Sequence, residues 1–163
     1  MLSGESAAGK YPVESVRAMR DIALATEDNI NWEERYHRNA LSLGNDFNSA
    51  ICNSAVYAAY QVNAKAIICV TINGVTAFNL AAYRPSCPII AICVNDKACR
   101  QLNLAWNVFP VYAEEKNSTD ELFQYAIDKA LETKIVKPGD TVIITGGSAV
   151  GEYGTDTFKL HII

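Results

Sequence analysis

The stretch that decides the fold runs from residue 64 to residue 94 and reads AKAIICVTINGVTAFNLAAYRPSCPIIAICV. It begins and ends with short apolar runs, 64–70 and 87–94, that have the length and composition of buried strands. Between them, Gly74 offers a tight turn, and a short apolar helix is stopped by Pro85. A strand, a helix and a second strand in this order predict a βαβ unit with parallel pairing.

The same alternation continues on both sides of this stretch. A stripe of small residues from Asn45 onward predicts a helix that lies close on a sheet, and the capping box of Ser118 and Glu121 opens another helix. Further expected elements are a helix in 95–106 and strands in 107–113, 141–145 and 158–163. The last strand follows its neighbour through a glycine-rich loop without a helix, so we expect it to be antiparallel. The predicted fold class is α/β: a three-layer, mostly parallel five-stranded sheet with helices on both faces and an antiparallel C-terminal edge strand.

The N-terminal part of the chain reads differently from the rest. Pro12 stands where a first helical turn tolerates proline, and an amphipathic helix should follow it. The next segment, EDNINWEERYHRN (27–39), is polar with few apolar anchors and is interpreted as a connector rather than core. The expected division is therefore a first segment 1–28, a connector 29–44 and an α/β domain 45–163.

Composition excludes several classes of function. The formal charge is −4, and no run of Lys or Arg is present to follow a phosphate backbone, so nucleic acid is not an expected partner. No apolar stretch reaches the roughly 20 residues that span a bilayer, and no signal peptide is evident, so we expect neither a membrane partner nor secretion. The five cysteines lack metal-site spacing, and Cys69 and Cys93 stand in apolar runs typical of the core.

No motif supports a free-standing enzyme. The sequence contains no nucleophile elbow, no P-loop and no dinucleotide fingerprint, and the glycine-rich GGSAVG (146–151) lacks the Lys-Ser/Thr end of a phosphate loop. No residue is predicted to be catalytic and none to bind a metal. A small α/β hydrolase or transferase remains as an alternative of a different class.

One loop has the residue types of an anion site. Backbone N–H groups at a helix start, the hydroxyls of Thr71 and Thr76, the amide of Asn73 and a close approach at Gly74 could hold a phosphate. The same residues also suit an ordinary turn between a strand and a helix. The residues alone leave both interpretations open.

Two long segments resemble the pyruvate kinase family. MLSGESAAGKYPVESV (1–16) is similar to the end of the last barrel strand and the start of the last barrel helix of these enzymes. YRPSCPIIAICVNDKACRQLNLAWNVFPV (83–111) resembles a motif of their C-terminal domain. The resemblance implies a cytoplasmic glycolytic enzyme that transfers phosphate from phosphoenolpyruvate to ADP, giving pyruvate and ATP.

The resemblance also implies a division of labour within the parent enzyme. Segment 1–28 would be a remnant of the catalytic barrel, and the rest would be an allosteric and subunit-contact domain. Magnesium and potassium would act in the full-length enzyme, whereas no cofactor is expected in this fragment. Without the barrel, which would be its partner in the full chain, the isolated fragment should be inactive.

Family resemblance favours an effector site made of two loops. The first matches Thr71, Ile72, Asn73, Gly74, Val75 and Thr76, and the second matches the glycine-rich segment with Gly151, Glu152, Tyr153 and Gly154. The arginine that receives a second phosphate in members activated by fructose bisphosphate is matched by Leu122. A sugar monophosphate or a nucleoside monophosphate is therefore the expected effector. A purely structural module without an effector is the alternative.

The terminal strand is the expected subunit contact. An edge strand has unpaired backbone groups, and this one offers little charge to discourage pairing. Two-fold symmetry would let it meet its own copy, as the family's tetramers also imply. We expect a homo-oligomer, a dimer as a fragment and a tetramer at full length, through Phe158, Lys159, Leu160, His161 and Ile162.

Overall fold

A computed structural model describes residues 1–39, 44, 46–114, 118–147 and 154–163. The chain divides into two compact units, Met1–Asn31 and Trp32–Ile163. The first contains the helical turn α1 (Gly4–Ala7) and the helix α2 (Pro12–Glu27), and neither has a buried residue. The expected proline-led helix is therefore present, with Pro12 as its first residue.

The second unit is built on one five-stranded sheet, as the sequence predicts. Its strands are β1 (Ala66–Thr71), β2 (Ile89–Cys93), β3 (Val108–Tyr112), β4 (Thr141–Gly146) and β5 (Thr157–Ile162). They lie in the order β3-β2-β1-β4-β5. The first four pair in parallel, and β5 pairs antiparallel with β4. The predicted fold class is confirmed, including the antiparallel strand at the C-terminal edge.

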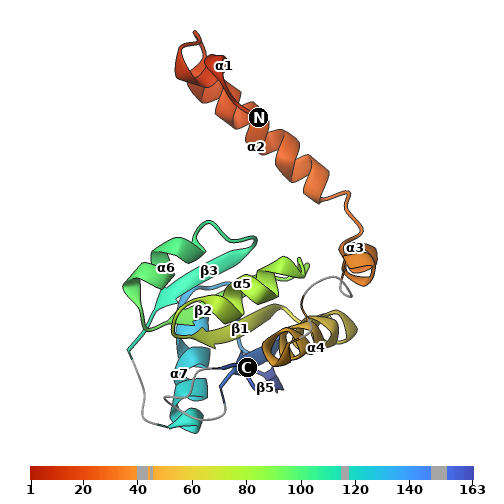
Figure 1. Cartoon of the computed structure of the whole chain (residues 1–163), viewed down its shortest axis with the longest axis vertical. Helices are drawn as coiled ribbons and strands as arrows, with labels where there is room; N and C mark the ends of the chain where they lie inside the picture. Colours follow the sequence, from red (N-terminus) through yellow and green to blue (C-terminus); the bar gives the residue numbers. More distant parts are fainter. Residues whose placement is uncertain (40–43, 45, 115–117, 148–153) are drawn as a thin grey trace. The chain divides into compact units, whose positions relative to one another are not determined.

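Helices cover both faces of this sheet (Figure 1). The helices of this unit are α3 (Trp32–Asn39), α4 (Phe47–Gln61), α5 (Val75–Ala82), α6 (Asp96–Leu102) and α7 (Thr119–Glu132). Residues of α3, α4, α5 and α6 bury one face, and residues of α7 bury the other. Because side chains alternate along a strand, Ile67 and Cys69 of β1 point to the first face while Ala66 and Ile68 point to the second.

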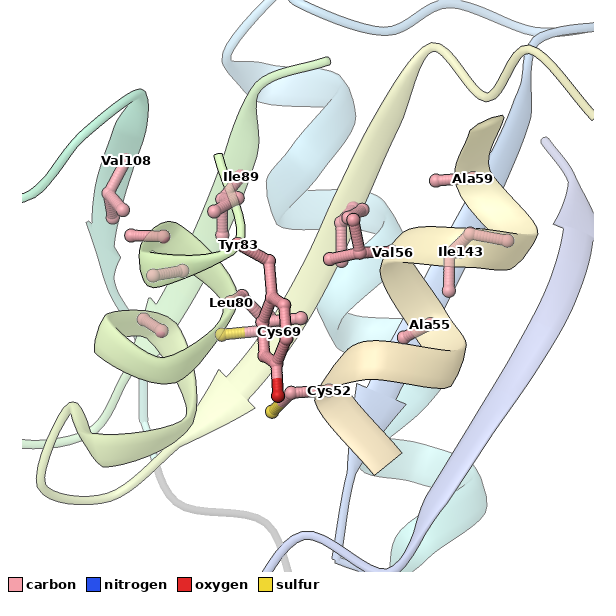
Figure 2. Close-up of a cluster of buried hydrophobic side chains, with 14 of the residues drawn as sticks. Cys52, Ala55, Val56, Ala59, Cys69, Leu80, Tyr83, Ile89, Val108 and Ile143 are labelled. Carbon is pink, nitrogen blue, oxygen red and sulfur yellow. The ribbon is translucent and has the colours of Figure 1, made fainter. Parts of the chain in front are cut away.

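The larger core lies between α4, α5 and the sheet (Figure 2). Small side chains of α4, Ala55 and Ala59, let this helix approach β1 and β4 closely, as the small-residue stripe predicts. Larger residues, Leu80 and Ile89, fill the space toward β2 and β3 and are fully buried. Cys69 and Cys93 are also fully buried, so their predicted place in the core is confirmed.

The segment interpreted as a connector contains a short helix with a buried side chain. Residues 32–39 form α3, and Tyr36 is buried in the larger core. Its hydroxyl donates to the Oδ1 of Asn53 in α4 at 2.5 Å, and its ring contacts those of Tyr60 and Tyr83. Trp32 is half-buried and its ring lies 4.9 Å from that of Trp106. Two aromatic side chains therefore anchor an otherwise polar helix, and two are too few for the periodicity of the segment to indicate burial.

The two edges of the sheet differ in their backbone groups. In β3, Ala113 N–H donates to Cys93 and Ile89 N–H donates to Asn107, so odd-numbered residues bond inward and Pro110 lies at an outward position. Pro110 therefore removes one donor from this free edge. Directly after β5, Ile163 bonds inward to residues 139 and 140, so the N–H of Leu160 points outward. No proline stands at an outward position of β5.

Candidate functional site

The candidate site lies where the carboxyl ends of β1 and β4 meet. Thr71 ends β1 and Gly146 ends β4, and the two strands are neighbours. From β1, the chain proceeds to β2 on one side, whereas β4 lies on the other side. In open α/β sheets, such a switch point is where loops diverge and ligands bind. The predicted loop 71–76 begins at this position.

Two hydrogen bonds within the loop shape the turn into α5. Gly74 precedes the helix with a φ of +86°, in the left-handed region that favours glycine. Its N–H donates to Thr71 Oγ1 at 3.0 Å, and Val75 N–H donates to Asn73 Oδ1 at 3.2 Å. The side-chain oxygens of Thr71 and Asn73, which could have faced a ligand, thus accept hydrogen bonds from the loop itself.

Thr76 has a partner that the sequence did not indicate. Its hydroxyl lies 2.5 Å from the hydroxyl of Thr155, and both residues are buried. Thr155 directly follows the glycine-rich segment after β4, so this bond joins the start of α5 to the residue that comes after that segment. No local pattern distinguishes Thr155 from the other threonines nearby, and only the folded chain brings it to α5.

The start of α5 has two buried donors for which no described residue provides an acceptor. Thr76 is 5% exposed and Ala77 is fully buried. Their backbone N–H groups make no hydrogen bond to any other residue that the structure describes. The first N–H groups of every helix are free of intrahelical partners, but burial without an acceptor is rare and costly. By contrast, Asn95 caps α6 by accepting from Lys97 N and Ala98 N.

The backbone conformation of Gly74 limits which side chains the turn can accept. A Cβ at Gly74 would meet only Leu102, at 3.5 Å, so space alone would tolerate a side chain. The φ of +86° is nevertheless strained for any L side chain, most of all a β-branched one. Gly74→Val would therefore strain the turn itself, and variants at other positions are needed to test the loop.

The remaining predicted residues are placed as follows. Residues 151–153 lie outside the described residues, and Gly154 has a φ of +150°. Leu122 lies in the first turn of α7 and is half-buried. In β5, Phe158 packs against the larger core, whereas Leu160 and Ile162 are 49% and 68% exposed.

Thiols contribute no reactive group to this site. Burial raises the pKa of Cys52 to about 12 and that of Cys87 to about 11, and it raises the pKa of Cys69 well above its ordinary value.

Within the described ranges, no three His, Cys, Asp or Glu side chains form a group that could hold a metal ion. No described helix is long and apolar enough to cross a membrane.

Comparison with known proteins agrees with this fold. The family model described as "Pyruvate kinase, alpha/beta domain" matches residues 49–161. The chain belongs to the pyruvate kinase family. The match covers α4 through β5 and includes both loops of the candidate site.

Curated members of this family are similar along the whole chain. Pyruvate kinases of Sporosarcina psychrophila and Geobacillus stearothermophilus are each 40% identical over 164 aligned positions, covering 100% of this chain. The pyruvate kinase of Staphylococcus aureus strain USA300 is 38% identical over the same length. The chain spans 28% of the length of each of these relatives. It corresponds to the C-terminal domain of a pyruvate kinase, and its relatives are named as this phosphotransferase.

Proposed function

We propose that this chain is the allosteric and subunit-contact domain of a cytoplasmic pyruvate kinase that transfers phosphate from phosphoenolpyruvate to ADP. The observation that carries the regulatory part is the pair of buried N–H groups of Thr76 and Ala77, for which no described residue provides an acceptor. A phosphate oxygen is a strong acceptor, and the start of a helix favours negative charge. An anion at this place would satisfy both donors.

The nature of the donors sets the expected affinity and ligand. Residues 71–76 contain no Lys or Arg, so binding rests on neutral groups and is modest. Leu122 stands where an arginine would receive a second phosphate by resemblance. We therefore expect ribose or hexose monophosphates to bind no worse than fructose bisphosphate. A preference for the bisphosphate above about tenfold, roughly 1.4 kcal/mol, would mean that another group replaces that arginine.

Backbone amide resonances provide the direct test. During titration with ribose or hexose monophosphates, the N–H resonances of Thr76 and Ala77 should show the largest shifts. Lys97 and Ala98 are matched internal controls, because they occupy a helix start that Asn95 already caps. If only the control resonances shift, or if no resonance shifts at millimolar ligand, the domain is better described as a structural module that binds no effector.

The subunit-contact part rests on the outer edge of β5. Leu160 and Ile162 are exposed there, and the outward N–H of Leu160 has no partner among the described residues. A two-fold axis through Leu160 would pair this strand antiparallel with its copy and satisfy both edges. We propose a dimer of the isolated chain and a tetramer, with barrel contacts, of the full enzyme.

The catalytic part of the proposal assigns the chemistry to other segments. Pyruvate kinases hold metal and phosphate on barrel strands, and the described residues provide no metal cluster. A polypeptide of these 163 residues, given phosphoenolpyruvate, ADP, magnesium and potassium, should form no pyruvate above the blank. Turnover that copurifies with the chain and survives further purification would instead favour a free-standing α/β enzyme.

A further inference from the structure

Asn73 and Gly74 form the only Asn–Gly pair in the chain. Asparagine before glycine is open to an intramolecular reaction, because a glycine nitrogen carries no neighbouring Cβ that hinders its approach to the side-chain carbonyl. We propose that Asn73 is a site of spontaneous deamidation and that the hydroxyl of Thr71 controls its rate. Nothing in the proposed regulatory function requires this modification.

The loop prepares the carbonyl of Asn73 for attack. Asn73 is exposed, so water and base reach it. Its Oδ1 accepts from Val75 N at 3.2 Å, which folds the side chain back over the peptide that contains Gly74 N. The same hydrogen bond withdraws electron density from the side-chain carbonyl and makes its Cγ more electrophilic.

Thr71 restrains the nucleophile. Gly74 N–H donates to Thr71 Oγ1 at 3.0 Å, and this bond is buried. The nitrogen must lose its proton and turn toward Asn73 Cγ before it can attack. Since the hydrogen bond holds the N–H toward Thr71, it opposes both changes, and the native loop should react more slowly than the same sequence in an unfolded chain.

The chemistry needs only water. Gly74 N forms a bond to Asn73 Cγ, the Cγ–Nδ2 bond breaks, and ammonia leaves with the proton from the nitrogen, giving a cyclic imide. Water then opens the imide at either carbonyl, giving aspartate or isoaspartate. One water is consumed and one ammonia is released, with no change of oxidation state.

The products would change the start of α5. Either one places a carboxylate beside the N–H groups of Thr76 and Ala77, which bond to no described residue, and negative charge is favourable at a helix start. An anionic ligand would then meet a like charge at its own site. Isoaspartate also lengthens the main chain by one carbon. This consequence rests on the proposed phosphate site, whereas the reaction itself does not.

Mass spectrometry of aged protein tests the reaction. Wild type, Thr71→Val, Thr71→Ser and Asn73→Gln are incubated together at mildly alkaline pH, and the peptide containing residue 73 is analysed. Thr71→Val should deamidate several-fold faster than wild type, and Thr71→Ser, which keeps the hydroxyl, should match wild type. Asn73→Gln should show no comparable change, because its longer side chain forms a less favourable ring.

Further controls keep the test decisive. Asn53, which precedes Ser54 inside α4, should stay intact. If Thr71→Val fails to fold, wild type in urea replaces it and should react several-fold faster than native wild type. Equal rates in all folded variants and in urea would overturn control by Thr71, and an intact Asn73 under every condition would overturn the site. Asn73→Asp should weaken phosphate binding several-fold. If wild type binds no phosphate, the phosphate site is wrong, and the deamidation result still stands on its own.

Discussion

The hydroxyl of Thr76, in the first turn of α5, lies 2.5 Å from the hydroxyl of Thr155, which is 79 positions further along the chain. Both side chains are buried, and the bond joins the loop after β1 to the segment that leads into β5. The start of α5 and the residues just before β5 are therefore coupled by a buried hydrogen bond.

Replacing Thr155 should weaken this coupling. Thr155→Val leaves the Thr76 hydroxyl buried without its partner, so the free energy of unfolding should fall by about 1–3 kcal/mol in urea denaturation. Thr157→Val is the control, because the Thr157 hydroxyl makes no hydrogen bond to another described residue. This variant should change the free energy of unfolding little. Replacing both Thr76 and Thr155 with Val should cost less than the sum of the single variants. Strict additivity would contradict the coupling.

The subunit contact can be tested at one backbone donor. Leu160→Pro removes an N–H that points away from β4, so the internal ladder should survive while pairing with a second copy is lost. Light scattering should show a change from dimer to monomer. Tyr112→Pro, at an outward position of β3, is the matched control and should remain dimeric. A folded Leu160→Pro variant that stays dimeric at low micromolar concentration would exclude this strand as the contact.

Tyr36 should contribute more to stability than its surroundings suggest. Tyr36→Ala removes a buried ring and its bond to Asn53, so the free energy of unfolding should fall by about 3 kcal/mol. Tyr36→Phe keeps the ring and should cost about 1 kcal/mol. His37→Ala, at the next and exposed position, is the control and should be close to neutral. Similar losses for Tyr36→Ala and His37→Ala would mean that α3 is not anchored by this residue.

Buried thiols predict an alkaline loss of stability. Burial raises the pKa of Cys52 from 9.0 to about 12 in the folded chain. The contribution of this thiol to the free energy of unfolding is complete below pH 9 and is lost as pH rises toward 12. In that window only the unfolded state releases the proton of the Cys52 thiol. Between pH 7 and pH 10, the stability difference between wild type and Cys52→Ala should therefore shrink by about 1.4 kcal/mol.

A core variant without a titrating group serves as the control for that measurement. Val56→Ala lies on the same helix and replaces a fully buried side chain. Its stability difference from wild type should be independent of pH over the same range. A parallel change in both variants would assign the alkaline effect to other groups.

The strands were predictable because both faces of the sheet are covered. Burial on both faces makes β1 and β2 nearly continuous apolar runs, which are recognisable without neighbours. The turn into α5 was predictable for a similar local reason, since Gly74 supplies the left-handed residue that this turn requires. Local chemistry was enough in both cases.

Other features depend on contacts that no local pattern records. Tyr36 anchors a polar helix through a neighbour 17 positions away, and Thr155 meets Thr76 only in the folded chain. The internal use of the Thr71 and Asn73 oxygens was also missed, because residue types indicate donors and acceptors but not which partner satisfies them.

The two edges of the sheet differ in how well they could pair with a further copy of the chain. Pro110 interrupts the outward donors of β3, whereas β5 keeps its own. If two copies join through β5, the combined sheet presents only the proline-bearing strand at each end. Addition of a third copy would then meet a poor template, so the molecule can extend its sheet once and not propagate into a fibre.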